Sequence, residues 1–134
     1  MNLIIEEYLC YNASEILPLY ESAGWIAYTQ SPDLLARAFA SSLLTLAARD
    51  GEKLIGLLRA VGDGETIVFI QDILVSPEYR RKGIGSTLLK EIMNRYAHVR
   101  QIQLTADDDP ELAAFYQSQG FRALSDLRCI AYSK

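Results

Sequence analysis

The sequence predicts an α/β (α+β) fold with a mixed, mostly antiparallel sheet that is flanked by helices. Two patterns carry this prediction. Strand-like segments separated by tight turns follow one another between residues 43 and 75, as in an antiparallel meander. From residue 66 a strand-like, a helical and a second strand-like segment alternate, as in a parallel β-α-β unit. A chain of 134 residues has the usual size of one domain, so a single domain over residues 1–134 is expected.

Residues 2–8 are apolar with an acidic end, which predicts an opening strand. Asn12 or Ser14 can cap a helix that runs to about Ala23, because either side chain can accept a hydrogen bond from a free N–H of the first turn. Gly24 then ends this helix, since glycine readily adopts the left-handed conformation found after a helix.

An aromatic loop from Trp25 to Tyr28 is expected to follow. Ser31 would cap a second helix, and Pro32 would occupy its first position, where a missing N–H costs nothing. This loop is therefore an aromatic-rich segment between two helices.

Three strands are expected next, with turns at residues 49–52 and 62–64 between them. They cover residues 43–48, 53–61 and 66–75. The last contains a continuous apolar run from Ile67 to Ile70, which is typical of a strand buried on both faces. The meander is therefore expected to end on a central strand.

The second half of the chain is expected to hold a helix after Gly85, a strand at residues 101–105 and a helix at residues 111–119. The strand at residues 101–105 should run parallel to the one at residues 66–75, because such crossovers are right-handed. Asp109 is expected to cap the last helix, and Gly120 to end it. Two further strands are expected, from Phe121 onward and at residues 127–133.

The composition argues against several classes of protein. A net charge of −4 and a pI near 5.0 argue against non-specific nucleic-acid binding. The apolar runs are too short to span a bilayer and the first residues lack the basic flank of a signal peptide, so a cytoplasmic protein without membrane contact is expected. Cys10 and Cys129 lie in apolar stretches and are expected to be buried free thiols without metal-ligand spacing. No metal is expected, and a homodimer is left open.

The strongest functional signal runs from Val75 to Ser86, where a strand ends, a basic loop follows and two glycines open a helix. Glycine lets a ligand approach the backbone, and the N–H groups of a first helical turn bind phosphate. A P-loop needs its lysine after a glycine, and a dinucleotide fingerprint needs a third glycine where Leu88 stands, so neither motif fits. A basic helix start with glycines for tight packing is the alternative.

Three motifs follow one another in this half of the chain: DILVSP at residues 72–77, RRKGIG at residues 80–85 and FYQSQGF at residues 115–121. The second has the pattern Arg/Gln-x-x-Gly-x-Gly/Ala. With these motifs the chain resembles the GNAT N-acetyltransferase superfamily over nearly its whole length. The resemblance implies an enzyme that moves the acetyl group of acetyl-CoA to a primary amine by direct attack through a tetrahedral intermediate.

The resemblance also implies where acetyl-CoA binds. In the family, the strand before the basic loop bulges and splays from the next parallel strand, and the pantetheine arm pairs with its backbone. This places the arm along Ile73, Leu74 and Val75, with the amide of Leu74 polarising the thioester carbonyl. The residues expected around the pyrophosphate are Arg80, Arg81, Lys82, Gly83, Ile84, Gly85 and Ser86.

The remaining site residues concern the acceptor and the protons. Tyr116 corresponds to the family's general acid, which protonates the departing thiolate, and a core tyrosine is the alternative. Asp72 is a base or an anchor for the amine, or else a surface or bulge carboxylate. Trp25 and Tyr28 would wall the acceptor site, unless they only pack. A small-molecule amine is the expected acceptor, and a module that senses acyl-CoA without turnover is the alternative function.

Overall fold

The computed structural model describes all residues from 1 to 134 and forms two compact units, Met1–Leu104 and Thr105–Lys134. The single domain expected over residues 1–134 stays a prediction.

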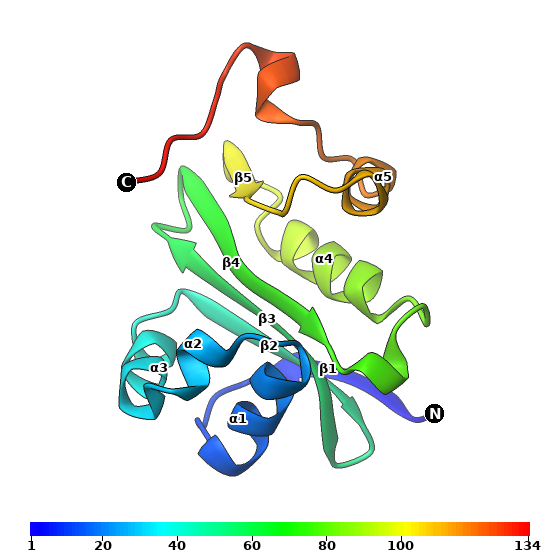
Figure 1. The fold of residues 1–134 in the computed structure, drawn as a ribbon. Helices are drawn as coiled ribbons and strands as arrows, with labels where there is room; N and C mark the ends of the chain where they lie inside the picture. The colour runs from blue at the N-terminus through cyan, green and yellow to red at the C-terminus, as the bar shows by residue number, and fades with distance from the viewer. The chain divides into compact units, whose positions relative to one another are not determined.

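The first unit is built on a five-stranded sheet with the order β1-β2-β3-β4-β5 (Figure 1). Neighbouring strands from β1 to β4 are antiparallel, and β5 is parallel to β4. The strands are β1 (Leu3–Glu7), β2 (Leu44–Asp50), β3 (Lys53–Gly62), β4 (Ile67–Val75) and β5 (Gln101–Leu104). A mixed, mostly antiparallel sheet with one parallel pair confirms the predicted fold class.

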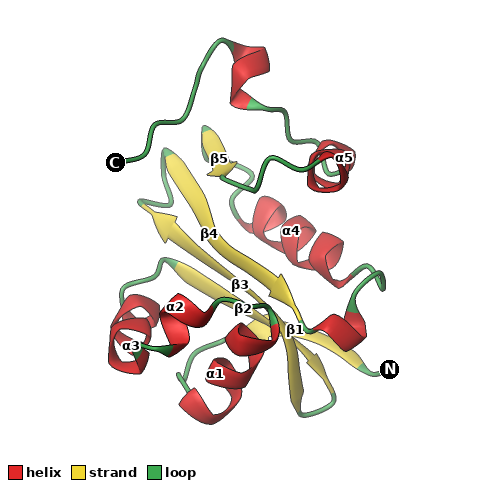
Figure 2. Ribbon diagram, in the orientation of Figure 1, coloured by secondary structure: helices red, strands yellow, loops and turns green.

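Helices lie on both faces of this sheet (Figure 2). They are α1 (Ala13–Ser22), α2 (Ile26–Thr29), α3 (Pro32–Ala40) and α4 (Ile84–Arg95), with a 3₁₀ turn η1 (Pro77–Tyr79) before α4. On one face, α1 and α3 pack on the strands through Ile16, Leu19, Tyr20, Leu35, Ala47, Leu54, Leu57 and Leu74. On the other face, Gly56 of β3 lets α4 approach closely, because a Cβ there would lie 3.3 Å from the Ile84 side chain.

Two expectations for the first unit are corrected by the structure. The middle strand is β3, which is buried continuously from Leu54 to Ala60. The expected central strand, β4, is an inner strand of the sheet, but it alternates between buried and more exposed positions and so is not buried on both faces. The expected aromatic loop is largely the short helix α2, closed by a hydrogen bond from the Gln30 N–H to the Ile26 carbonyl.

The second unit contains the helix α5 (Pro110–Ser118) and a 3₁₀ turn, η2 (Leu124–Leu127). Asp109 caps α5 as predicted, since its Oδ2 accepts a hydrogen bond from the Leu112 N–H at 3.0 Å. The two strands expected after residue 120 are wrong, because residues 121–123 and 129–134 have no strand partner. A β-prone sequence forms a strand only beside another backbone.

The expectation of buried thiols is also wrong, since Cys10 and Cys129 are both exposed. Their apolar neighbours Leu9 and Ile130 are themselves 82% and 69% exposed, so they do not cover the thiols. None of the helices has the length and apolar character that crossing a lipid bilayer requires.

Candidate active site

A bulge in β4 shapes the candidate site. Arg59 of β3 pairs with Asp72, whereas the next residue, Ala60, pairs with Ile70, so Gln71 has no partner. An extra residue of this kind bends the strand and increases its twist. The bulge that the family resemblance implies is therefore present, at Gln71.

Beyond the bulge, one edge of β4 is open. The pairing with β5 begins at Ile67 and stops where Ile70 meets Leu104. The segment from Ile73 to Val75 pairs only with β3. Its backbone groups on the opposite edge can therefore bond to an extended ligand that lies along the strand.

The register indicates which amides face this open edge. The N–H of Ser76 donates to the Ile55 carbonyl of β3 at 2.7 Å, and Leu74 continues the same antiparallel register. Backbone groups alternate in direction along a strand, so the Leu74 amide also points to β3, and those of Ile73 and Val75 point to the open edge. The register thus argues against the predicted role of the Leu74 amide and favours one of its neighbours.

The open edge leads into the basic loop and the N-terminus of α4. Gly83 precedes the helix with φ +79°, and its side-chain position is open, with no atom within 4 Å. No side chain caps this end of α4, so its first turn offers backbone N–H groups and a positive dipole end to an anion. Arg80, Arg81 and Lys82 are exposed at the same end and add positive charge.

Asp72 is a buried carboxylate with two charged or polar partners. It is 2% exposed, and its Oδ2 accepts hydrogen bonds from Arg59 Nε at 2.7 Å and from the Tyr20 hydroxyl at 2.8 Å. Burial, together with the Asp72 charge, raises the pKa of Tyr20, so this phenol stays protonated and donates. Burial alone would lower the pKa of Arg59, but the facing carboxylate raises it above the usual value, so this pair is ionic.

The predicted acceptor residues pack around the same tyrosine. The ring centres of Trp25 and Tyr28 each lie 5.7 Å from that of Tyr20, and Phe39 follows at 6.1 Å. Trp25 and Tyr28 are half-buried, so part of each ring is available to a ligand. The fold therefore connects Asp72 with Trp25 and Tyr28 through Tyr20, although these residues are far apart in the sequence.

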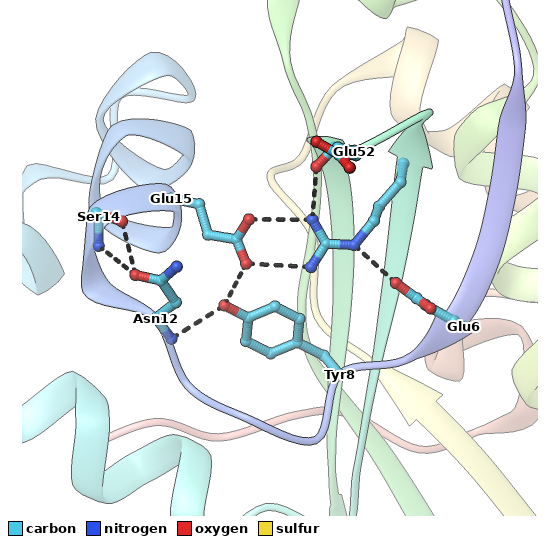
Figure 3. A network of polar contacts seen from close by, with 7 residues as sticks. Glu6, Tyr8, Asn12, Ser14, Glu15 and Glu52 are labelled. Atoms are coloured by element: carbon cyan, nitrogen blue, oxygen red, sulfur yellow. Dashed lines mark hydrogen bonds and ion pairs between the residues drawn. The ribbon is translucent and has the colours of Figure 1, made fainter.

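A polar network anchors the helix that carries Tyr20 (Figure 3). Arg49 on β2 binds both carboxylate oxygens of Glu15 on α1, at 3.0 and 3.1 Å, and its Nε binds Glu6 on β1 at 2.7 Å. The Tyr8 hydroxyl donates to Glu15 at 2.7 Å. The hydrogen bond from Arg49 is the main reason that the pKa of Glu15 lies below its usual value. Charged contacts on both sides thus fix α1 against the sheet.

Tyr116 lies on α5 in the second unit. It is half-buried, with ring contacts to Phe115 at 5.1 Å and to Phe121 at 6.0 Å. Burial raises its pKa, which keeps the phenol protonated and able to give a proton to a thiolate.

Sequence reasoning missed Tyr20 and Arg59. Arg59 gave a signal that could have been used, because a lone cation inside the apolar run of β3 needs a buried anionic partner. Tyr20 gave none, since it occupies an ordinary apolar position of an amphipathic helix.

Comparison with known proteins places these features in a family context. The acetyltransferase (GNAT) family model matches residues 6–121. An uncharacterized N-acetyltransferase of Gracilaria tenuistipitata var. liui, ycf52, is 28% identical over 126 residues, covering 88% of this chain and 68% of the relative. A GNAT-family acetyltransferase structure from Streptococcus pneumoniae TIGR4 is 35% identical with a TM-score of 0.89, covering 98% of this chain and 96% of that one. A further GNAT-family structure, from Elizabethkingia anophelis with acetyl-CoA bound, shares the fold at 21% identity and a TM-score of 0.65, covering 90% and 76% of the two chains.

Proposed function

The chain belongs to the acetyltransferase (GNAT) family of acetyl-CoA-dependent N-acetyltransferases, and we propose that it acetylates a primary amine by direct attack of the amine nitrogen on the thioester. One observation supports this most. The open edge of β4 runs into the basic loop and the uncapped end of α4. The strand edge can pair with the amides of the pantetheine arm, and the helix end can bind the pyrophosphate. The two features are adjacent in the protein, as the arm and the pyrophosphate are in acetyl-CoA.

Backbone groups would make most of the contacts with acetyl-CoA. The pantetheine arm would lie along Ile73 to Val75, and an amide of this segment that faces the open edge would donate to the thioester oxygen. A fixed donor there stabilises the negative charge that develops as the amine attacks. The pyrophosphate would meet the N–H groups of residues 81–86, with Arg80 at the rim.

The proton steps would involve Asp72 and Tyr116. As the new C–N bond forms and the C–S bond breaks, the amine loses a proton and the departing thiolate takes one. Both hydrogen bonds to Asp72 fall on Oδ2, so Oδ1 would accept the amine proton, directly or through water. Tyr116, which its raised pKa keeps protonated, would supply the proton to sulfur.

A panel of amines tests this proposal. The protein is mixed with acetyl-CoA and polyamines, aminoglycosides, amino sugars or peptides, and the free thiol of CoA is measured against a control without amine. We expect release of thiol with at least one amine, and a higher melting temperature with acetyl-CoA, since a ligand at a hundred times its Kd stabilises a fold by about 2.7 kcal/mol. Stabilisation without thiol release from any amine would support the acyl-CoA sensor instead. The absence of any shift at millimolar acetyl-CoA would contradict both.

A further inference from the structure

Tyr79, the last residue of the 3₁₀ turn η1, stands directly before the basic loop and contacts a different part of the sheet. Its hydroxyl donates a hydrogen bond of 2.8 Å to Oδ2 of Asp50, at the end of β2. This bond is the main reason that the pKa of Tyr79 lies above its usual value, so the phenol stays protonated and donates at neutral pH. The hydrogen bond therefore ties the start of the basic loop to the turn between β2 and β3.

The acceptor of this hydrogen bond is itself held in place. Asp50 pairs with Leu3 of β1 and with Lys53 of β3 in the sheet. Its other carboxylate oxygen, Oδ1, accepts a hydrogen bond from the Asn2 N–H at 2.9 Å. That contact is the main reason that the pKa of Asp50 lies below its usual value, so the carboxylate is charged at neutral pH. Tyr79 is thus bound to a fixed part of the sheet.

The ring of Tyr79 also positions two ammonium groups. Lys82 Nζ, from the basic loop, lies 5.3 Å from the ring centre, and Lys53 Nζ, from the start of β3, lies 5.5 Å from it. Both distances are typical of cation–π contacts. Lys53 also forms an ion pair of 3.5 Å with Glu78, which partly balances its charge. Lys82 is therefore the better placed of the two to meet a phosphate group.

The basic loop contains a residue in an unfavourable backbone conformation. Arg81 has φ +63°, in the left-handed region that residues other than glycine rarely adopt. Such a conformation persists only where the surrounding structure holds it. Tyr79 fixes one end of the loop, and α4 begins directly after Gly83 at the other end. The conformation of the loop therefore depends on the contacts at both ends.

We propose that Tyr79 is a positioning residue for acetyl-CoA, which holds the basic loop through Asp50 and Lys82 in the conformation that receives the pyrophosphate. This inference rests on the proposed function, because it concerns the same acetyl-CoA site. A loop that already has its binding conformation loses little freedom when the ligand arrives. A released loop has that conformation only part of the time, and the apparent affinity falls in the same proportion. The effect of Tyr79 should therefore appear only with ligands that carry phosphate groups.

Calorimetry with CoA is the first test, since binding needs no acceptor amine. Tyr79→Phe keeps the ring and removes the hydroxyl, and it should raise the Kd for CoA about three- to tenfold, the effect of one hydrogen bond. Tyr8→Phe is the matched control, because the Tyr8 hydroxyl also donates to a carboxylate, that of Glu15 on α1, at 2.7 Å. This control should bind CoA as the wild type does. Equal Kd values for Tyr79→Phe and the wild type would overturn the inference, whereas a wild type that does not bind CoA would contradict the proposed function itself.

A comparison of two acyl donors separates positioning of the loop from general damage to the site. S-acetylpantetheine has the thioester and the pantetheine arm of acetyl-CoA but no phosphate group. With an amine that the wild type accepts, Tyr79→Phe should raise KM for acetyl-CoA about three- to tenfold without a change in kcat. The same variant should keep the wild-type kcat/KM for S-acetylpantetheine. An equal loss with both donors would refute the positioning role.

The direction of the Asp50→Ala effect is a third test. CoA is an anion, so removal of a nearby negative charge would by itself tighten binding. Loss of the hydrogen bond predicts the opposite, a higher Kd for CoA when Asp50→Ala is made in the wild type. The same change should cause no further rise in Tyr79→Phe, where the bond is already lost. A lower Kd in Asp50→Ala than in the wild type, or full additivity of the two changes, would overturn the inference.

Discussion

Replacing Asp72 with asparagine should destabilise the protein more than a typical surface change. The Arg59 and Asp72 side chains are 6% and 1% exposed, and the charge on each is balanced by the other. Removing one partner of a buried ion pair leaves an uncompensated charge, which costs about 3–5 kcal/mol. The amide oxygen of asparagine can still accept from Tyr20, so we expect a loss near the lower end of that range. For a chain of this length the melting temperature should fall by roughly 10–20 °C.

Urea denaturation followed by circular dichroism measures this loss. The midpoint should fall while the slope with urea concentration stays the same, which marks a change of stability and not of the unfolded state. A triple variant, Asp72→Leu with Arg59→Met and Tyr20→Phe, removes all three polar groups together and is the control. Because it leaves no orphaned charge or hydroxyl, it should be more stable than Asp72→Asn.

The reasoning fails if Asp72→Asn loses less than about 1 kcal/mol, the range of a solvated pair. It also fails if the triple variant is the less stable of the two, because polar contacts would then outweigh the cost of burying them. Any loss of activity in Asp72→Asn must be measured well below the lowered melting temperature, so that a catalytic effect is separated from unfolding.

Four further changes test other parts of the structure. Glu15→Gln should cost roughly 1–2 kcal/mol at pH 7, and the difference from wild type should shrink as pH falls below about 4.3, because the lowered pKa of Glu15 stabilises the fold only while the carboxylate is charged. Gly83→Val should abolish acetyl-CoA binding in calorimetry, whereas Gly24→Val, at a similar φ of +81° in open space, should keep it. Tyr116→Phe should lower kcat about 10²–10⁴-fold with unchanged acetyl-CoA affinity, and the wild-type rate should not decline with pH before about 10, since burial raises the pKa of this phenol. Trp25→Ala should raise KM for the acceptor more than it lowers kcat. If the variant and the wild type have the same KM for every accepted amine, the Trp25 ring only packs and does not bind the acceptor.

Local signals in the sequence were enough to predict most of the elements. Asn12 caps α1 through a hydrogen bond from the Ser14 N–H, and Asp109 caps α5 in the same way, because capping depends on residues only two or three positions apart. Gly83 takes the left-handed conformation at the start of α4, where a side chain would be strained. The parallel pair of β4 and β5 follows from the helical crossover, α4, that connects the two strands.

The parts that the sequence did not predict depend on contacts between distant segments. Which face Asp72 occupies depends on the bulge at Gln71, and nothing near that residue in the sequence marks it as unpaired. The partners Arg59 and Tyr20 come from another strand and a helix, so the ion pair needs the sheet register to be known first. The two strands expected after residue 120 were wrong because strand-forming residues there have no strand to pair with, and the sequence alone does not show whether a partner is present.

The ion pair between Arg59 and Asp72 also affects which acceptor amines the site can select. A free carboxylate at Asp72 would attract a cationic amine from a distance, but Arg59 at 2.7 Å cancels most of its field. The buried pair can still hold Tyr20, and through it the rings of Trp25 and Tyr28, in a fixed arrangement. Aromatic faces bind a cation by contact within about 6 Å and not by long-range attraction. Selectivity among amines should therefore follow the shape and ring contacts of the acceptor more than its total charge, and acceptance of amines in simple proportion to their charge would argue against this arrangement.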